Sequence, residues 1–103
     1  TQPMSAIPPD QGGKLMPDTT NQMIVDAWNN RTAYFKALGQ PLPRRDTGIF
    51  NAWRREWLAG RYRGPVESQE YDTVDTRGVK VKAQDFGGSI CHWYPLTSVA
   101  VWV

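Results

Sequence analysis

The spacing of apolar residues changes from a helical to a strand period near Gly60. The apolar positions of the first stretch recur at intervals of three, four and seven residues: Ile24, Trp28, Phe35 and Leu38. This spacing predicts an amphipathic helix that is capped by Thr19 or Thr20 and stopped by Gly39. One face of that helix is therefore expected to enter a core.

A second helix is expected after the segment 40–43, because the two prolines of that segment cannot continue a helix. Asp46 or Thr47 can cap the second helix, and Gly60 can end it. Its apolar residues form one stripe: Ile49, Phe50, Trp53, Trp57 and Leu58. Its polar residues lie opposite: Asn51, Arg54 and Arg55. We expect the stripe, with both of its tryptophans, to belong to the core.

Beyond Gly60 the period of two and the glycine-rich breaks predict short strands. Their expected ranges are Tyr71–Val74, Val79–Gln84, Ser89–Trp93 and Val99–Val103. Residues 75–78 and 94–98 are expected to form hairpin turns, with a positive φ at Gly78, and Gly87 and Gly88 to form a bulge or a close backbone approach. The fold class predicted is α+β: two N-terminal helices packed on a small antiparallel β-meander of three or four short strands.

Composition assigns the chain to one domain and adds few constraints on function. The 103 residues carry a formal net charge of +2 and one cysteine, which excludes a disulfide within the chain. The sequence contains no apolar run of about 18 residues, so no membrane span is predicted. No retained signal peptide is recognised either. Residues 1–18 are rich in proline and glycine and are expected to be a flexible linker or tail. The folded domain is expected over 19–103.

The order of landmarks from Ile49 to the end of the chain is more specific than the composition. Trp53 and Trp57 precede a Gly-Pro…Glu segment at 64–70. The run 84–95 then holds glutamine, phenylalanine, glycine, isoleucine, tryptophan and proline in sequence, with one extra residue near 91–92. This order resembles the LGFP repeat, a module of bacterial cell-surface and cell-wall-acting proteins. The Leu-Gly-Phe-Pro signature itself is absent: segment 37–41 echoes it, and 62–65 occupies its expected place.

The resemblance implies an anchoring role, in which such modules bind cell-wall glycan or surface polymer and are attached by linkers to amidases, peptidases or acyltransferases. Aromatic rings bind sugars by stacking, while carboxylates and guanidinium groups take the hydroxyls. The candidate ligand-binding residues are Trp102, Tyr94, Trp93, Tyr62, Glu70, Arg61 and Arg63. If Val101 and Val103 face inward, the alternation of the strand turns Trp102 outward.

An alternative interpretation is a protein-interaction module or a nucleic-acid or polyanion surface on the arginine-rich second helix. Its arginines are Arg44, Arg45, Arg54 and Arg55, with Arg61 and Arg63 shortly after. Acidic residues in the same stretch can neutralise part of that charge: Asp46, Glu56, Glu67 and Glu70. Nucleic acid is therefore the less favoured partner.

The candidates for catalysis are Glu67, Glu70, Asp72, Asp75, Asp85, Cys91 and His92. Glu70 and Asp72 are expected on one strand face about 7 Å apart, a separation compatible with inverting glycosidases. Cys91 and His92 are adjacent and so point to opposite faces, where they cannot form a nucleophile and base pair. One histidine and one cysteine also cannot supply a zinc site. We expect no catalysis, no metal and no cofactor.

Together these patterns predict a non-catalytic bacterial or phage cell-wall binding module that anchors an attached enzyme. Its expected partners are a wall glycan or surface polymer and an upstream catalytic domain. Its expected location is extracellular or in the cell envelope, and cytoplasmic before release if a phage encodes it.

Overall fold

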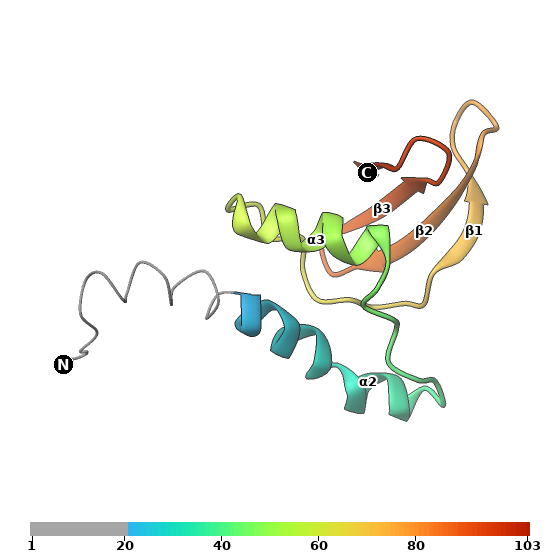
Figure 1. Ribbon diagram of the computed structural model, residues 1–103. Coiled ribbons are helices and arrows are strands. Elements are labelled where there is room, and N and C mark those ends of the chain that lie inside the picture. Colours follow the sequence, from blue (N-terminus) through green and yellow to red (C-terminus); the bar gives the residue numbers. More distant parts are fainter. Residues whose placement is uncertain (1–20) are drawn as a thin grey trace, which may run out of the picture.

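The computed structural model describes residues 21–103 (Figure 1). Residues 21–29 are helical, a turn follows at 30–31, and α2 covers Thr32–Ala37. The remaining elements are α3 (Gly48–Leu58), β1 (Tyr71–Val74), β2 (Lys80–Phe86), β3 (Ser89–Tyr94) and β4 (Val99–Trp102). The helices come first and the antiparallel sheet second, which confirms the predicted α+β class.

The four strands form one sheet in the order β1-β2-β3-β4, as expected for a meander. Both predicted hairpin turns are present, and Gly78 has a φ of 82°. The main difference is the length of β2, which runs two residues past the predicted end at Gln84. The turn at 87–88 is so tight that pairing continues to Phe86, which is opposite Ser89.

The first predicted helix is interrupted, so the expectation of one helix ending with a buried Leu38 was wrong. The Arg31 Nε donates to the Val66 carbonyl, and the Thr32 hydroxyl donates to the Asn29 carbonyl. The Thr32 hydroxyl takes a carbonyl that a regular helix would bond through its backbone, and Arg31 ties the turn at 30–31 to the loop that holds Val66. Leu38 follows α2 as its C-cap and is exposed. The proposed caps at Thr19 and Thr20, like the segment 1–18, lie outside the described residues.

The second helix begins where the sequence allowed, and Thr47 is its cap: the Phe50 N–H donates to the Thr47 hydroxyl. Gly60 ends it with a φ of 82°. Leu58 was wrongly assigned to the buried stripe and is exposed. Nine residues make two and a half helical turns, so Leu58 points away from Ile49.

The core is an aromatic cluster between the helices and the sheet. The Trp53 ring stacks on Phe86 at a centroid distance of 6.0 Å and meets Trp28 edge-on at 5.3 Å. Both indole N–H groups donate hydrogen bonds to backbone carbonyls. The acceptor of Trp28 is the Pro43 carbonyl, and the acceptor of Trp53 is the Gly64 carbonyl. Trp28 and Trp53 are therefore confirmed as core residues, and Trp57 packs half-buried against them.

A close backbone contact joins the loop after α3 to the β2–β3 turn. Gly64 has a φ of 90°, and a Cβ at this position would lie 2.7 Å from the Gly87 Cα. The Gly88 N–H donates to the Arg63 carbonyl, and the Gly87 N–H donates to the Pro65 carbonyl. The close approach expected at the glycine pair is thus observed, and its partner is the 63–65 loop.

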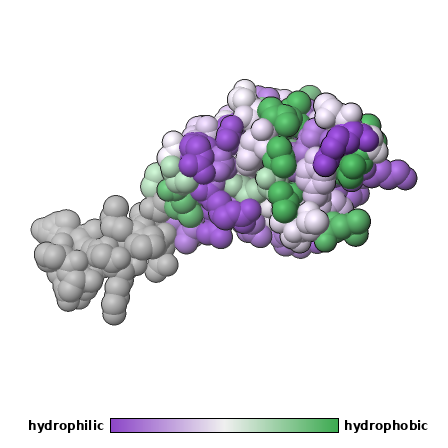
Figure 2. Space-filling view, turned by 90° about the horizontal axis from the view of Figure 1, so that it is seen from above, coloured by the Kyte–Doolittle hydropathy of each residue, from purple (hydrophilic) through white to green (hydrophobic). Residues whose placement is uncertain are grey.

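The two faces of the sheet differ in cover. Phe86, Trp93 and Trp102 lie on the side that faces the helices, whereas Val101 and Val103 are 41% and 61% exposed on the other side. The assumption that Val101 and Val103 face the core was wrong. Because side chains alternate along the strand, Trp102 faces the core instead. Figure 2 shows a narrow hydrophobic band between hydrophilic regions on one face of the molecule.

Candidate functional site

The sheet extends past the start of α3. One end of the face that the sheet turns toward the helices is therefore not covered by α3. The helix contacts β3 and β4, and its first residue, Gly48, rests on the Trp93 indole. A Cβ on Gly48 would lie 2.3 Å from that ring, so only glycine fits this approach. β1 and the adjoining part of β2 therefore lack a helix above them.

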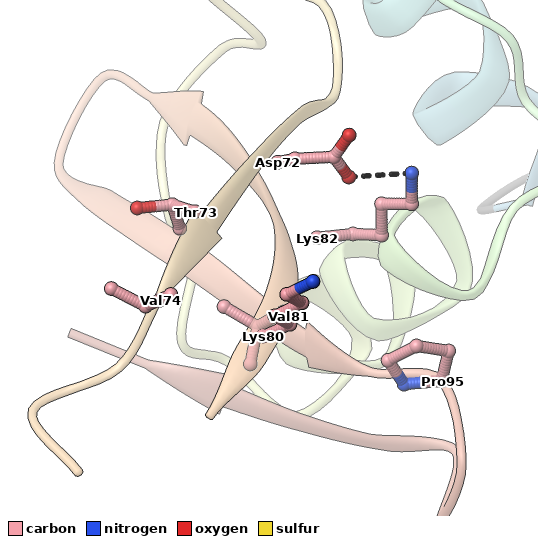
Figure 3. Close-up of a pocket in the computed structure, with 7 residues that line it drawn as sticks. All are labelled: Asp72, Thr73, Val74, Lys80, Val81, Lys82 and Pro95. Carbon is pink, nitrogen blue, oxygen red and sulfur yellow. Dashed lines mark ion pairs between the residues drawn. The ribbon is translucent and has the colours of Figure 1, made fainter. Parts of the chain in front are cut away.

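A pocket of about 540 Å³ opens at this uncovered end, and we call it the β1–β2 pocket. It is lined by residues 72–74 of β1, residues 80–82 of β2 and Pro95. Figure 3 shows Asp72 and Lys82 pointing toward each other from neighbouring strands, and their charged groups are 2.6 Å apart.

The register places charged and aromatic groups of this pocket in one row. Asp72 is opposite Lys82, and Lys82 is opposite the half-buried Trp93. The hydrogen bond that Lys82 donates to the Asp72 carboxylate, together with the negative charge of that group, raises the pKa of Lys82. Lys80 lines the pocket as well, and within residues 21–103 it has no ion-pair partner. The pocket thus combines an ion pair and an ammonium group without an ion-pair partner, whereas the Trp93 indole beyond Lys82 is covered by Gly48 of α3.

A smaller cavity of about 180 Å³ lies beside the start of α3 and is lined by Arg44, Thr47, Gln69 and Glu70. Glu70 precedes β1, so it does not pair with Asp72 in one cleft as the sequence suggested. The pKa of Arg44 is raised by its hydrogen bond with Asp46 and, to a lesser extent, by the charge of Glu70. This cavity adds polar groups near the pocket but no acid–base pair.

Three of the predicted ligand residues lie together at the other end of α3, where they serve the fold. Arg61 and Arg63 both pair with Glu56, at 2.9 and 2.7 Å. Hydrogen bonds from these two arginines lower the pKa of Glu56 to about 2. The Arg63 guanidinium also lies 5.2 Å from the centre of the Trp102 ring.

Tyr62 lies between Arg61 and Arg63 at the same end of α3, whereas the other candidates lie elsewhere. Tyr62 is exposed and its ring lies 4.5 Å from Trp57. Tyr94 is half-buried on the side of the sheet away from the helices, where its hydroxyl donates to Asp75 at 2.6 Å. Only Trp93 and Glu70 lie at the N-terminal end of α3, so the seven predicted residues do not form one site.

The arginines of the polyanion alternative are also divided by their contacts. Arg44 pairs with Asp46, and Arg54 donates to Asn21 at 3.0 Å. Arg45 and Arg55 are exposed, and in the part of the chain that the structure describes they form no ion pair. The Asn21 amide does not neutralise Arg54, so three of the four arginines have no ion pair among the described residues: Arg45, Arg54 and Arg55.

The groups considered for catalysis have structural partners. Cys91 is fully buried, and burial raises the pKa of its thiol to about 12. Asp85 accepts a hydrogen bond from Tyr71 at 2.6 Å and thereby raises the pKa of Tyr71 to about 12. Among residues 21–103 no three His, Cys, Asp or Glu side chains are placed to hold a metal ion. None of the helices described there has the length and apolar character to cross a membrane.

Comparison with known proteins finds no matching family model, no similar curated protein and no similar solved structure. The resemblance to LGFP repeats therefore rests on the motif residues alone. In the structure the run 84–95 forms the β2–β3 hairpin, and the Gln84 amide donates to the Ser68 carbonyl and holds the preceding loop.

Sequence reasoning missed Val74, Lys80, Lys82 and Pro95 as site residues. The Lys-Val-Lys alternation at 80–82 was a usable signal, because it directs two ammonium groups to one face of a strand. What it could not supply was the register that puts Asp72 and Trp93 beside Lys82.

Proposed function

We propose that this domain is a non-catalytic binding module for bacterial cell-wall polymer, peptidoglycan or surface glycan, and that it anchors an attached enzyme at the cell envelope. The observation that carries the proposal is the β1–β2 pocket, where charged and apolar groups adjoin on an uncovered end of the sheet. This combination suits a wall polymer that carries charged groups next to small apolar groups.

The position of the pocket also suits a long ligand. β1 is an edge strand, so a polymer can cross the pocket without threading through an enclosed cavity. Binding at one such site is expected to be weak, with a dissociation constant on the order of micromolar to millimolar. Weak binding is sufficient in a tethered module, because the tether raises the effective concentration of the attached enzyme at its substrate.

Binding is favoured over catalysis by the state of the candidate reactive groups. Asp72 forms an ion pair with Lys82, and Asp75 accepts a hydrogen bond from the Tyr94 hydroxyl. Cys91 is buried, and burial raises the pKa of its thiol. A general acid or nucleophile needs an accessible group near its partner and the substrate. The pocket offers groups for recognition instead.

The proposal is tested by sedimentation with purified sacculi, using one variant that fills the pocket. Val74→Trp places an indole on the pocket lining, and Val99→Trp is the matched control on the other edge strand. Both valines are exposed, so both variants are expected to fold. We expect Val74→Trp to reduce the bound fraction at least fivefold and Val99→Trp to leave it unchanged. Equal binding by both variants would remove the pocket from the function.

A second arm separates this proposal from the polyanion alternative. Binding to a polyanion through several arginines falls steeply with salt, because each neutralised phosphate releases a counterion. We expect sacculus binding to survive the Arg54→Ala/Arg55→Ala double change and to weaken only modestly at about 0.5 M salt, because few charged contacts are screened. Loss of binding in both conditions, with Val74→Trp unaffected, would favour a polyanion partner.

A further inference from the structure

We infer that the β1–β2 pocket recognises a carboxylate that carries a small apolar substituent, as found at the end of the short peptides attached to wall glycan. The inference rests on the proposed function and narrows it, since it assigns recognition to the peptide part of the polymer. It follows from the charge balance of the pocket and from the chemistry of the rest of its lining.

Among its lining residues the pocket has one positive charge more than it has negative charges, and the charge of Glu70, outside the lining, acts on Lys82. Lys82 is occupied by Asp72 at 2.6 Å, and Asp72 is the only acid among the lining residues. Lys80 therefore presents an ammonium group that no carboxylate of residues 21–103 neutralises. A ligand with a single negative charge completes this balance, whereas a neutral sugar leaves it unchanged.

The rest of the lining is poor in hydrogen-bonding side chains. Val74 and Pro95 line the pocket beside the lysines, whereas Thr73 and Val81 pair with each other and direct their side chains to the opposite face of the sheet. A sugar ring needs a partner for most of its hydroxyls, and burying an unpartnered hydroxyl is costly. A methyl group next to a carboxylate fits better, because it contacts the apolar lining while the carboxylate reaches Lys80.

The size of the pocket and its backbone lining agree with a short peptide. About 540 Å³ accommodates a ligand of a few residues. Three consecutive residues of each strand line it, so main-chain groups of β1 at the sheet edge lie next to the ligand. Peptide amides can use such groups as an added strand does.

The first experiment titrates the protein with N-acetyl-D-alanyl-D-alanine and, in parallel, with its C-terminal carboxamide, followed by amide chemical shifts. The two probes differ in the carboxylate alone. We expect shifts at 72–74 and 80–82 with the acid, and binding at least tenfold weaker with the carboxamide.

Lys80→Gln is expected to weaken binding of the acid about tenfold. Lys36→Gln, which changes an exposed lysine of α2, is expected to have no effect. Equal binding of both probes, or no effect of Lys80→Gln, overturns the inference.

The second experiment separates this inference from the proposed function. Sacculi are compared before and after an amidase has removed the peptides and left the glycan strands. Loss of binding to the stripped glycan, together with a defect of Lys80→Gln on intact sacculi, supports the inference. Full binding to stripped glycan overturns it and leaves the wall-binding function standing. Failure to bind either material, with the dipeptide still bound at 80–82, rejects the wall function and keeps the carboxylate site.

Discussion

The two ends of α3 use charged and aromatic side chains in opposite ways. At the C-terminal end Glu56 holds two arginines, and one of these, Arg63, lies over Trp102. At the N-terminal end Gly48 rests on Trp93, and the sheet beyond it is open. We call these the sealed end and the open end.

The difference lies in the burial of the acid at each end. The Glu56 side chain is 13% exposed, whereas the Asp72 side chain is 81% exposed. A largely buried carboxylate between two guanidinium groups must stay paired, because an unpaired buried charge is costly. An exposed ion pair exchanges easily with water and ligand. Charged residues are therefore structural at the sealed end and available for binding at the open end.

The strongest way to break the sealed end is to remove its aromatic centre. Trp53 is 1% exposed and its indole donates to the Gly64 carbonyl. Trp53→Ala is expected to destabilise the domain by about 3–5 kcal/mol, because it leaves a large cavity and an unpaired carbonyl. Denaturant unfolding measures this loss. Trp53→Phe is the control and should lose less, since a ring still packs on Phe86. Native stability of the alanine variant would contradict the core assignment.

The sealed end can also be destabilised through the close backbone contact between Gly64 and Gly87. Gly64→Ala puts a Cβ 2.7 Å from Gly87 at a φ of 90°, so we expect a loss of about 2–3 kcal/mol. Gly60→Ala is the matched control: its φ is 82° but nothing lies within 4 Å of the added carbon. It should cost only about 1 kcal/mol. Equal losses in the two variants would show that φ alone matters and that the loop contact does not.

How far the sequence predicted the structure depends on the range of the interaction. The helical stripe of Ile49, Phe50 and Trp53 and the alternation of the strands are local patterns, and they predicted the fold class and most element positions. The break at 30–31 was missed, and the Arg31 side chain at this turn donates to Val66, which lies 35 residues along the chain. Local spacing contains no such information.

The site was harder to predict, because ligand candidates were selected by residue type. Arginine and tryptophan suit sugars in general, yet Arg61, Arg63 and Trp102 are used by the fold. Lys80 and Lys82 are ordinary solvated residues in sequence and become notable only because α3 starts too late to cover them. Which end of a sheet a helix covers is a tertiary property.

The pH dependence of stability tests the pairing at the sealed end. The folded pKa of Glu56 is about 2, against an ordinary value of 4.5. A carboxylate with a depressed pKa stabilises the folded state above pH 4.5, and this contribution is lost as the pH falls from 4.5 to 2. Glu56→Gln should cost about 1–2 kcal/mol at pH 7 and flatten the unfolding free energy across that window. An unchanged acid limb in the variant would show that other carboxylates set it.

The smallest expected effect is at the open end, where Asp72→Asn removes the acid of the exposed pair. Because the Asp72 carboxylate is 81% exposed, we expect the melting temperature to change by less than about 2 °C. The variant frees the Lys82 ammonium group beside Lys80, so the pocket gains attraction for a carboxylate. Binding of N-acetyl-D-alanyl-D-alanine should therefore strengthen about two- to fivefold, and this gain should shrink at high salt.

Glu67→Gln changes an exposed acid that does not line the pocket and is expected to alter neither quantity. If Asp72→Asn instead destabilises the domain as much as Glu56→Gln, both ends of α3 are structural, and the distinction between a sealed and an open end fails.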